Sequence, residues 1–276
     1  NRIVIMAVMG NEEIHPDLRR VAPFVPRQAV YPWSLPLLKR MPLLRPASND
    51  GVDVLTLPSG AGVRLYRPAN ATGNTPALLW IHGGGYVIGS PEQDDVLCRR
   101  YVEKLGITVA AVRYRLAPEH PFPAAPDDVE ATTRWLLAHA ESLGGQPGPL
   151  ALAGDSAGAQ LALVAARRLR GQGIGALGLF YPVAAHPDTL SASQHEHGHG
   201  KFLTRAAMDW FNQAYLGSDP SRRGHPEVDL LSAKGFELSA EQLREEYGIV
   251  KLLCKPFSPR ELAARVKALL RRMGRA

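Results

Sequence analysis

The sequence Gly-Asp-Ser-Ala-Gly at residues 154–158 carries one hydroxyl among small residues, at the G-x-S-x-G spacing of a nucleophile elbow. An apolar run at 150–153 precedes it and a helical pattern at 156–170 follows it. Glycines there allow a sharp turn that lifts the Ser156 hydroxyl above a sheet, and a helix N-terminus directs backbone N–H groups toward an oxyanion. The pattern predicts Ser156 as a nucleophile; a strand-to-helix turn without chemistry is the alternative.

A second glycine-rich segment, His-Gly-Gly-Gly-Tyr at 82–86, follows the apolar run 77–81. A glycine loop after a strand supplies oxyanion-hole N–H groups in some hydrolases, and one such donor is worth roughly 3 kcal/mol in the transition state. A phosphate cradle is the alternative. Neither a Gly-Lys-Ser/Thr sequence nor the Gly-x-Gly-x-x-Gly spacing of dinucleotide binders accompanies the loop. The two motifs together therefore predict a serine hydrolase.

Two further stretches carry a resemblance to a known family. One is Tyr-Arg-Leu-Ala-Pro-Glu-His-Pro-Phe-Pro-Ala at 114–124, followed by Asp127-Asp128, and the other is the helical segment 202–217. With the two glycine motifs, they make residues 48–232 resemble the hormone-sensitive-lipase-like bacterial carboxylesterases.

The resemblance implies an eight-stranded sheet, a cap and hydrolysis of short to medium acyl esters. It also implies roles for particular residues. Ser156 would be the nucleophile, and Gly83, Gly84 and the N–H of Ala157 would form the oxyanion hole. No cofactor and no metal is implied.

The family's catalytic acid and base are not found in this sequence. The family places an Asp-x-Leu turn after a seventh strand and a His-Gly-Phe turn after an eighth, whereas this chain continues from 225–231 into Ser232-Ala233-Lys234. Residues 231–274, with Lys255-Pro256-Phe257, instead resemble the end of a response-regulator receiver domain, in which that lysine contacts a phosphoryl group. We interpret the chain as a chimera of an esterase core and a receiver-like tail.

A serine without a general base is a weak nucleophile. In a studied serine protease, loss of the base costs about 10⁶ in rate, while the oxyanion hole and binding retain roughly 10³–10⁴ over water. Candidate substitute bases are His195, His197, His199, His225 and Lys255. Three hypotheses remain: a carboxylesterase with impaired activity, a catalytically silent hydrolase fold that binds acyl or aryl ligands, and a signalling module built on the receiver-like tail.

These residues must be positioned by an α/β fold. Patterns at 52–57 and 62–66 predict an antiparallel hairpin. Strands at 77–81, 108–113, 150–153 and 176–181 then alternate with helices at 96–105, 127–143 and 156–170. Apolar strands between amphipathic helices predict an α/β-hydrolase fold with a mostly parallel sheet, helices on both faces and a small cap.

We divide the chain into three parts. Residues 1–46 form an N-terminal cap segment, 47–232 a hydrolase core with a cap insertion at 184–216, and 233–276 a receiver-like α/β/α tail. A strand at 249–254 would extend the core sheet where the seventh strand belongs, so the last strands of the usual fold are replaced. An exposed sheet edge there predicts a homodimer through that edge.

Composition narrows the classes of protein and partner. The chain has 276 residues, of which 45% are hydrophobic and 21% charged, and a formal net charge of +6. Much of the positive charge falls on a predicted helix near residue 265, without interleaved aromatics, so a solvated helix face explains it better than nucleic-acid binding. Two cysteines are too few for a disulfide framework. We expect a cytoplasmic protein with no membrane span, no nucleic-acid partner and a small-molecule ester as substrate.

Overall fold

The computed structural model describes residues 47–69, 75–143, 149–183, 204–230 and 249–253, together with the single residues 35, 37 and 39. Its strands are β1 (Val52–Thr56), β2 (Gly62–Tyr66), β3 (Ala77–Ile81), β4 (Thr108–Arg113), β5 (Leu150–Asp155), β6 (Ile174–Phe180) and β7 (Ile249–Leu253). Its α-helices are α3 (Asp95–Leu105), α4 (Ala124–His139), α5 (Ala157–Arg168) and α7 (Arg205–Leu216), and its 3₁₀ helices are η2 (Pro91–Asp94) and η3 (Pro220–Gly224).

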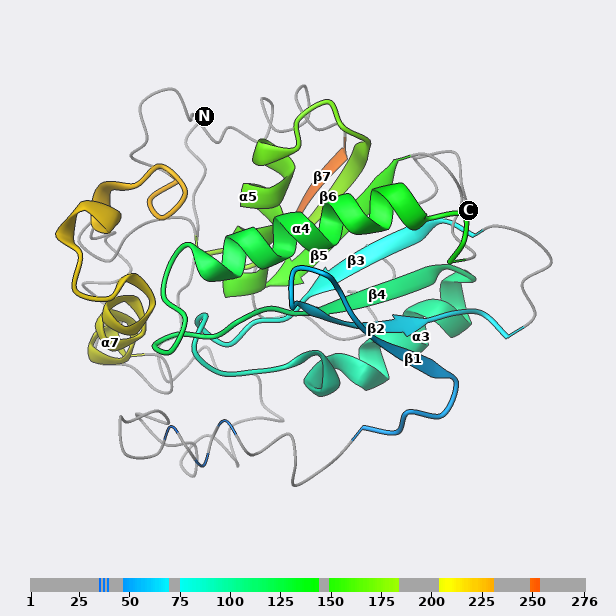
Figure 1. Ribbon diagram of the computed structural model, residues 1–276, viewed down its shortest axis with the longest axis horizontal. Coiled ribbons are helices and arrows are strands. Elements are labelled where there is room, and N and C mark those ends of the chain that lie inside the picture. The colour runs from blue at the N-terminus through cyan, green and yellow to red at the C-terminus, as the bar shows by residue number, and fades with distance from the viewer. Residues whose placement is uncertain are drawn as a thin grey trace, which may run out of the picture.

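The seven strands form one mixed sheet in the order β1-β2-β4-β3-β5-β6-β7 (Figure 1). The pairs β1–β2 and β2–β4 are antiparallel, whereas β3, β4, β5, β6 and β7 run parallel to one another. The predicted hairpin and the predicted mostly parallel sheet are both confirmed. In such a sheet, functional groups gather beyond the carboxyl ends of the parallel strands.

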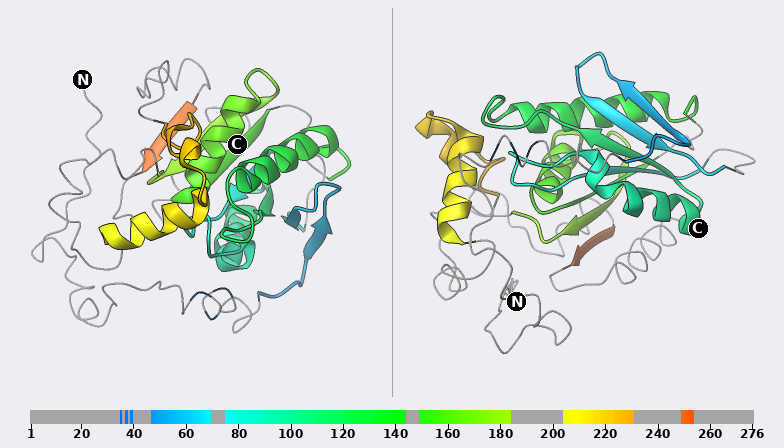
Figure 2. Two further views of the ribbon diagram at one scale, coloured as in Figure 1. Left: turned by 60° about the vertical axis from the view of Figure 1, so that its left-hand side comes forward. Right: turned by 90° about the horizontal axis from the view of Figure 1, so that it is seen from below.

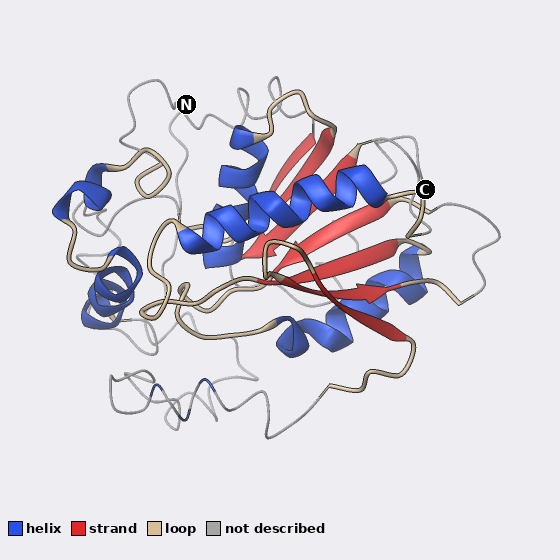
Figure 3. Ribbon diagram, in the orientation of Figure 1, coloured by secondary structure: helices blue, strands red, loops and turns tan. Residues whose placement is uncertain are grey.

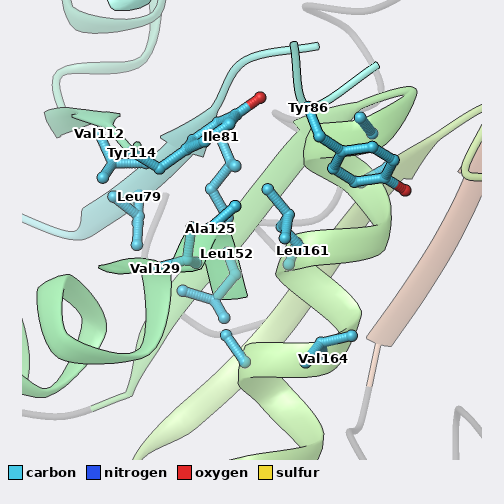
Figure 4. Packing of buried hydrophobic residues seen from close by; sticks show 14 of the residues in the cluster. Leu79, Ile81, Tyr86, Val112, Tyr114, Ala125, Val129, Leu152, Leu161 and Val164 are labelled. Atoms are coloured by element: carbon cyan, nitrogen blue, oxygen red, sulfur yellow. The ribbon is translucent and has the colours of Figure 1, made fainter. Parts of the chain in front are cut away.

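The two faces of the sheet are covered by different helices, because side chains alternate along each strand. On β3, Leu79 and Ile81 join the core beneath α4 and α5, whereas Leu78 and Trp80 join the core beneath α3. The right-hand view of Figure 2 shows α4 and α3 on opposite sides of the sheet, and Figure 3 shows the same layers by element type. Figure 4 shows the first core, in which strand residues meet Val129 of α4 and Leu161 and Val164 of α5.

The helix expected at 127–143 lies earlier in the chain, at Ala124–His139. Pro126 lies within its first turn, although proline cannot donate the hydrogen bond that a helix interior requires. It occupies the third helical position, where backbone N–H groups have no partner within the helix, so the missing donor costs little. The other predicted helices and strands of the core differ by at most two residues at each end.

Strand β7 lies beside β6 and runs parallel to it, pairing Ala176 with Ile249 and Phe180 with Leu253. The expectation that this segment extends the core sheet is therefore confirmed. The helices expected on either side of it, and most of the cap segments 1–46 and 184–216, lie outside the described residues. Among the helices that are described, none is long and apolar enough to cross a membrane.

Candidate active site

Ser156 stands at the junction between β5 and α5 in a strained backbone conformation. Its φ and ψ are 53° and −117°, and it caps the N-terminus of α5. A non-glycine residue in such a region costs on the order of 1–3 kcal/mol and persists only where its surroundings hold it. Here the Ser156 N–H donates to Phe180 O at 2.9 Å, and the N–H of Ala159 donates to Ser156 O at 3.2 Å. Strain of this kind is expected of a nucleophile elbow.

The two glycines of the elbow serve close packing rather than the turn itself. Neither Gly154 nor Gly158 has a positive φ, which corrects the expectation that they supply the sharp turn. A Cβ atom added at Gly158 would lie 2.1 Å from Ile81 O and 2.5 Å from His82 O. One added at Gly154 would lie 2.6 Å from Ile81 O. Only glycine lets α5 approach the end of β3 this closely.

The glycine loop after β3 lies directly against the elbow. A Cβ atom at Gly83 would be 2.7 Å from Asp155 Oδ2 and 3.0 Å from Asp155 O. Gly84 has a φ of +123°, and a Cβ atom there would be 2.0 Å from Ile88 O. The two motifs that the sequence separates widely are thus in backbone contact.

The proposed oxyanion-hole donors are left available by this arrangement. Within the described residues, the N–H groups of Gly83, Gly84 and Ala157 donate to no other residue. Ala157 is the first residue of α5, and the first N–H groups of a helix have no partner within it. Three N–H groups that have no acceptor among the described residues, and that lie at the two motifs around Ser156, suit an oxyanion ligand.

His82 is a structural histidine in this site. It is buried, and burial lowers its pKa to about 4, so the ring is neutral near pH 7. Its Nδ1 lies 2.8 Å from Gly83 O, a contact that requires the proton on Nδ1. The ring stacks on Tyr114 at 4.2 Å between centroids, and the Tyr114 hydroxyl donates to His82 O at 2.9 Å. His82 therefore supports the glycine loop.

Residues 114–128 pack beside the glycine loop. The buried Asp128 carboxylate accepts three hydrogen bonds from the Arg115 side chain, at 2.8 to 3.1 Å, and one from the Arg115 N–H at 2.8 Å. Two residues further on, the Ala117 N–H donates to Tyr86 O at 2.9 Å. The family-like motif thus acts by fixing the backbone around the loop.

Helix α7 covers the loop from the other side. A Cβ atom at Gly85 would lie 2.6 Å from the Phe211 ring, and the Tyr86 ring stacks on Tyr215 at 3.8 Å between centroids. Residues 202–217 were expected to supply a cap helix, but the individual contacts of Phe211 and Tyr215 were not foreseen. Helical spacing indicates which side chains share a face, and it does not say which loop they will meet.

Beneath the elbow, on the α3 side of the sheet, acidic and aromatic side chains form a second polar group. Tyr181 donates to Asp155 Oδ2 at 3.0 Å, and Trp80 Nε1 donates to Asp94 Oδ2 at 2.8 Å. Burial, and after it the charge of Asp155, raise the pKa of Asp94 to about 7. The involvement of Asp94 was not predicted from the sequence, because Asp94 is about sixty residues from the Gly-Asp-Ser-Ala-Gly motif.

The general base has no assigned position. No hydrogen bond reaches the Ser156 hydroxyl from another residue of the described ranges. His225 packs against Phe122, and its Nδ1 accepts the Glu227 N–H at 3.2 Å, which leaves the neutral ring with its proton on Nε2 and no free lone pair. The other candidates, His195, His197, His199 and Lys255, lie outside the described residues. The part of the chain that is described holds no cluster of metal-ligating side chains.

A protein-family model described as alpha/beta hydrolase fold matches residues 78–244. The match crosses the junction expected near residue 232, so it gives the receiver-like resemblance of 231–274 no support. Among solved structures, the chain is similar to a hyperthermophilic esterase from the archaeon Pyrobaculum calidifontis. The identity is 27%, the TM-score is 0.78, and the match covers 95% of this chain and 99% of that one.

Curated relatives are similar over shorter shares of their length. An ethyl acetate hydrolase of Pseudomonas putida is 40% identical over 162 residues, 55% of this chain and 50% of that protein. The carboxylic ester hydrolase LipN of Mycobacterium tuberculosis is 36% identical over 204 residues, 69% of this chain and 54% of that protein. An FAD-linked oxidoreductase, pytB, of Aspergillus terreus is 32% identical over 231 residues, 78% of this chain and 28% of that protein. The chain spans about half the length, or less, of these relatives.

Proposed function

The chain belongs to the α/β-hydrolase-fold family of hormone-sensitive-lipase-like carboxylesterases, and on that premise we propose that it hydrolyses short to medium acyl esters with Ser156 as nucleophile. The observation that carries the proposal is the contact between the elbow and the glycine loop. Among the described residues, the N–H groups of Gly83, Gly84 and Ala157 have no acceptor, and Ser156 beside them has a strained backbone conformation. Ethyl acetate, the substrate in the name of one relative, is an ester of a short acid.

In the proposed reaction, Ser156 Oγ attacks the ester carbonyl carbon while its proton passes to a base. The carbonyl oxygen becomes an oxyanion held by the three N–H groups. The alcohol then leaves with a proton, and an acyl-serine remains. Water attacks the acyl-serine by the same route, releases the carboxylic acid and restores the hydroxyl.

The test is hydrolysis of p-nitrophenyl butyrate by the protein and by Ser156→Ala. We expect the variant to lose the serine-dependent rate, and we expect acetate to octanoate esters to be cleaved faster than longer ones. A control reaction with a fluorophosphonate should label the protein once, and Ser156→Ala should stay unlabelled. Equal hydrolysis by both proteins would rule out Ser156 as nucleophile.

A catalytically silent, ligand-binding hydrolase fold is the second candidate. It is favoured by the observation that no base is bonded to Ser156 within the described ranges. A serine without a base leaves rates about 10⁶ below those of an intact triad. Alanine variants of His195, His197, His199, His225 and Lys255 separate the two candidates. If one of these residues is the base, its alanine variant should lose 10²-fold or more of the hydrolysis rate. A silent fold should show no serine-dependent turnover at all.

We also propose that residues 233–276 form a receiver-like tail joined to a hydrolase core of residues 47–232, with cap segments at 1–46 and 184–216. The support is the sequence from Leu231 to Leu262 and the parallel addition of β7 to β6, which a receiver α/β/α unit would also make. The gene sequence in the source genome provides the test. Continuity across the codons for residues 229–234 would show that the junction is natural.

A homodimer through the sheet edge completes the proposal. Strand β7 ends the order of the described sheet, and an unpaired edge offers backbone groups to a second copy. Light scattering after size-exclusion chromatography should then give twice the chain mass of 30.0 kDa. A mass equal to one chain at micromolar concentration would exclude the dimer.

A further inference from the structure

Tyr86 ends the glycine loop and is held on three sides. It has a positive φ of 65° and is 3% exposed. Its carbonyl accepts the Ala117 N–H, its ring stacks on Tyr215 with 12° between planes, and its hydroxyl donates to Gln160 Oε1. Figure 4 shows the Tyr86 ring beside α5. A residue fixed in this way sets the direction in which the preceding glycines leave the sheet.

Gln160 is the partner that links this loop to another part of the chain. It lies one turn into α5 and is 2% exposed. While its Oε1 accepts from Tyr86, its Nε2 donates to Val228 O at 2.9 Å and to Glu227 O at 3.2 Å. An amide is suited to this position, because a carboxylate could not donate to the carbonyls and an aliphatic chain could do neither.

The turn that Gln160 reaches, residues 225–230, is itself firmly held. Val228 is 5% exposed and Leu230 is fully buried in the core beneath α4 and α5. The Glu227 carboxylate receives two hydrogen bonds from Arg168, at 2.6 and 2.7 Å. Gln160 therefore connects the glycine loop to a rigid anchor and not to a mobile surface.

A displacement of Tyr86 would also move the proposed oxyanion donors of the glycine loop, because Gly84 and Gly83 are only two and three residues away in the chain. Gly84 O accepts the N–H groups of Val87 at 3.2 Å and of Ile88 at 3.0 Å, so the chain from Gly84 to Ile88 is a closed turn with Tyr86 inside it. Such a turn moves as a unit. Donors to an oxyanion must be held to within about 0.5 Å and 10–20° to be effective.

We propose that Gln160 is a positioning residue for the oxyanion loop, acting through the Tyr86 hydroxyl and anchored on the turn 225–230. This inference rests on the proposed function. Gln160 does not touch the reacting atoms, so its loss should lower the rate of the chemical step and leave substrate binding nearly unchanged.

The test uses three variants of the full chain. Gln160→Met keeps the length of the side chain and removes its hydrogen bonds, Tyr86→Phe removes only the hydroxyl, and Gln172→Met is the matched control at an exposed glutamine. With p-nitrophenyl butyrate, we expect kcat to fall about 10- to 100-fold in the first two variants, with KM within about threefold of the parent. The control should match the parent. The double variant Tyr86→Phe/Gln160→Met should be no slower than Gln160→Met alone, because both changes break one linkage.

A transition-state mimic separates positioning from general loss of structure. Affinity for a trifluoromethyl ketone, which forms an oxyanion on Ser156, should weaken by the same factor as kcat/KM, whereas inhibition by butyrate should not change. Unchanged kcat in Gln160→Met, or independent multiplying losses in the double variant, would overturn the proposal. So would equal weakening of the ketone and butyrate.

Hydrogen exchange keeps the inference testable if the proposed function fails. Turnover equal to that of Ser156→Ala identifies a failure of the function. In that case, amide exchange in peptides covering 83–88 and 227–230 decides the linkage. Faster exchange in both peptides for Gln160→Met and Tyr86→Phe, relative to Gln172→Met, supports it. Exchange at the parent rate in peptide 83–88 overturns it.

Discussion

At the scale of single residues, the site depends on glycines, because a residue without a side chain lets two backbone segments lie close together. Gly154 and Gly158 admit the carbonyls of Ile81 and His82 to distances that a Cβ atom would forbid. Strain is concentrated on Ser156, whose positive φ is imposed by the chain on both sides. In the elbow, therefore, Ser156 adopts the strained backbone conformation, and Gly154 and Gly158 allow the close backbone contacts.

The variant Gly158→Ala tests the close contact between α5 and β3. A methyl group 2.1 Å from Ile81 O must push α5 away from β3, and overpacking of this kind costs about 1–3 kcal/mol of unfolding free energy. Gly224→Ala is the matched control, because no atom lies within 4 Å of a Cβ there. Urea unfolding of both variants provides the measurement. Equal stability of the two would show that α5 does not lie as close to β3 as described.

At the scale of elements, ion pairs and caps decide how helices and turns are fixed around the sheet. Arg168 at the end of α5 pairs with Asp127 and Glu130 of α4 at 2.8 and 3.0 Å, and with Glu227 of the turn 225–230 at 2.6 Å. Hydrogen bonding to Glu227 is the largest of the effects that raise the pKa of Arg168. One guanidinium thus joins two helices to the anchor of the glycine loop.

Arg168→Met should lower the unfolding free energy by about 1–3 kcal/mol, because half-buried carboxylates would be left without their cation. Arg134→Met removes an exposed i,i+4 pair with Glu130 and should cost only about 0.3–0.5 kcal/mol. Thermal and urea unfolding at low and high salt compare the two. If both variants lose the same unfolding free energy, the Arg168 network contributes no more to stability than an exposed ion pair.

Helix α7 begins at a capped position, since the Thr204 side chain accepts the Ala207 N–H at 3.2 Å. Thr204→Ala should destabilise this end by about 1 kcal/mol, whereas Thr204→Ser keeps the oxygen and should change little. Because Phe211 and Tyr215 hold the glycine loop, proteolysis near residue 204 and the rate with p-nitrophenyl butyrate should respond together. If Thr204→Ala changes neither the proteolysis nor the rate, the start of α7 does not influence the glycine loop.

At the scale of the whole molecule, two buried groups give stability opposite dependences on pH. Asp94 has a pKa of about 7 in the fold against 3.8 for a free side chain, so the folded state binds the extra proton and its stability falls as pH rises from about 4 to 7. His82 has a pKa of about 4 against 6.5, so the unfolded state binds the extra proton and stability is lost as pH falls from about 6.5 to 4. The two effects overlap in pH and partly offset each other.

The variant Asp94→Asn removes the pH dependence of stability that is due to Asp94 and leaves the one that is due to His82. The pKa of Asp94 rises by about three units, and one unit corresponds to about 1.4 kcal/mol, so we expect the variant to be more stable than the parent by roughly 4 kcal/mol at pH 8. The advantage should shrink to nothing near pH 4, and the variant should lose stability more steeply between pH 6.5 and 4. Asparagine still accepts the Trp80 N–H, which limits other changes. Parallel curves for the two proteins from pH 4 to 8 would contradict the assignment.

The sequence by itself determined the strands, the α/β class and the family, because these follow from short-range patterns. Apolar runs separated by amphipathic helices specify a parallel sheet, and the motifs at 82–86 and 154–158 specify a turn chemistry that few folds use. Helix α4 was misplaced by three residues at its start, where the structure accommodates Pro126 in the first turn because the N–H groups there have no partner within the helix.

The tertiary structure alone decided which residues meet. Three interactions join residues that are far apart in the chain or share no motif. They are the contact of Gly83 with Asp155, the link from Tyr86 through Gln160 to Val228, and the effect of the Asp155 charge on Asp94. Periodicity assigns a side chain to a face of its own element, whereas its partner depends on how two elements pack. For that reason the nucleophile was predictable from the chain, and the residues that position its oxyanion loop were not.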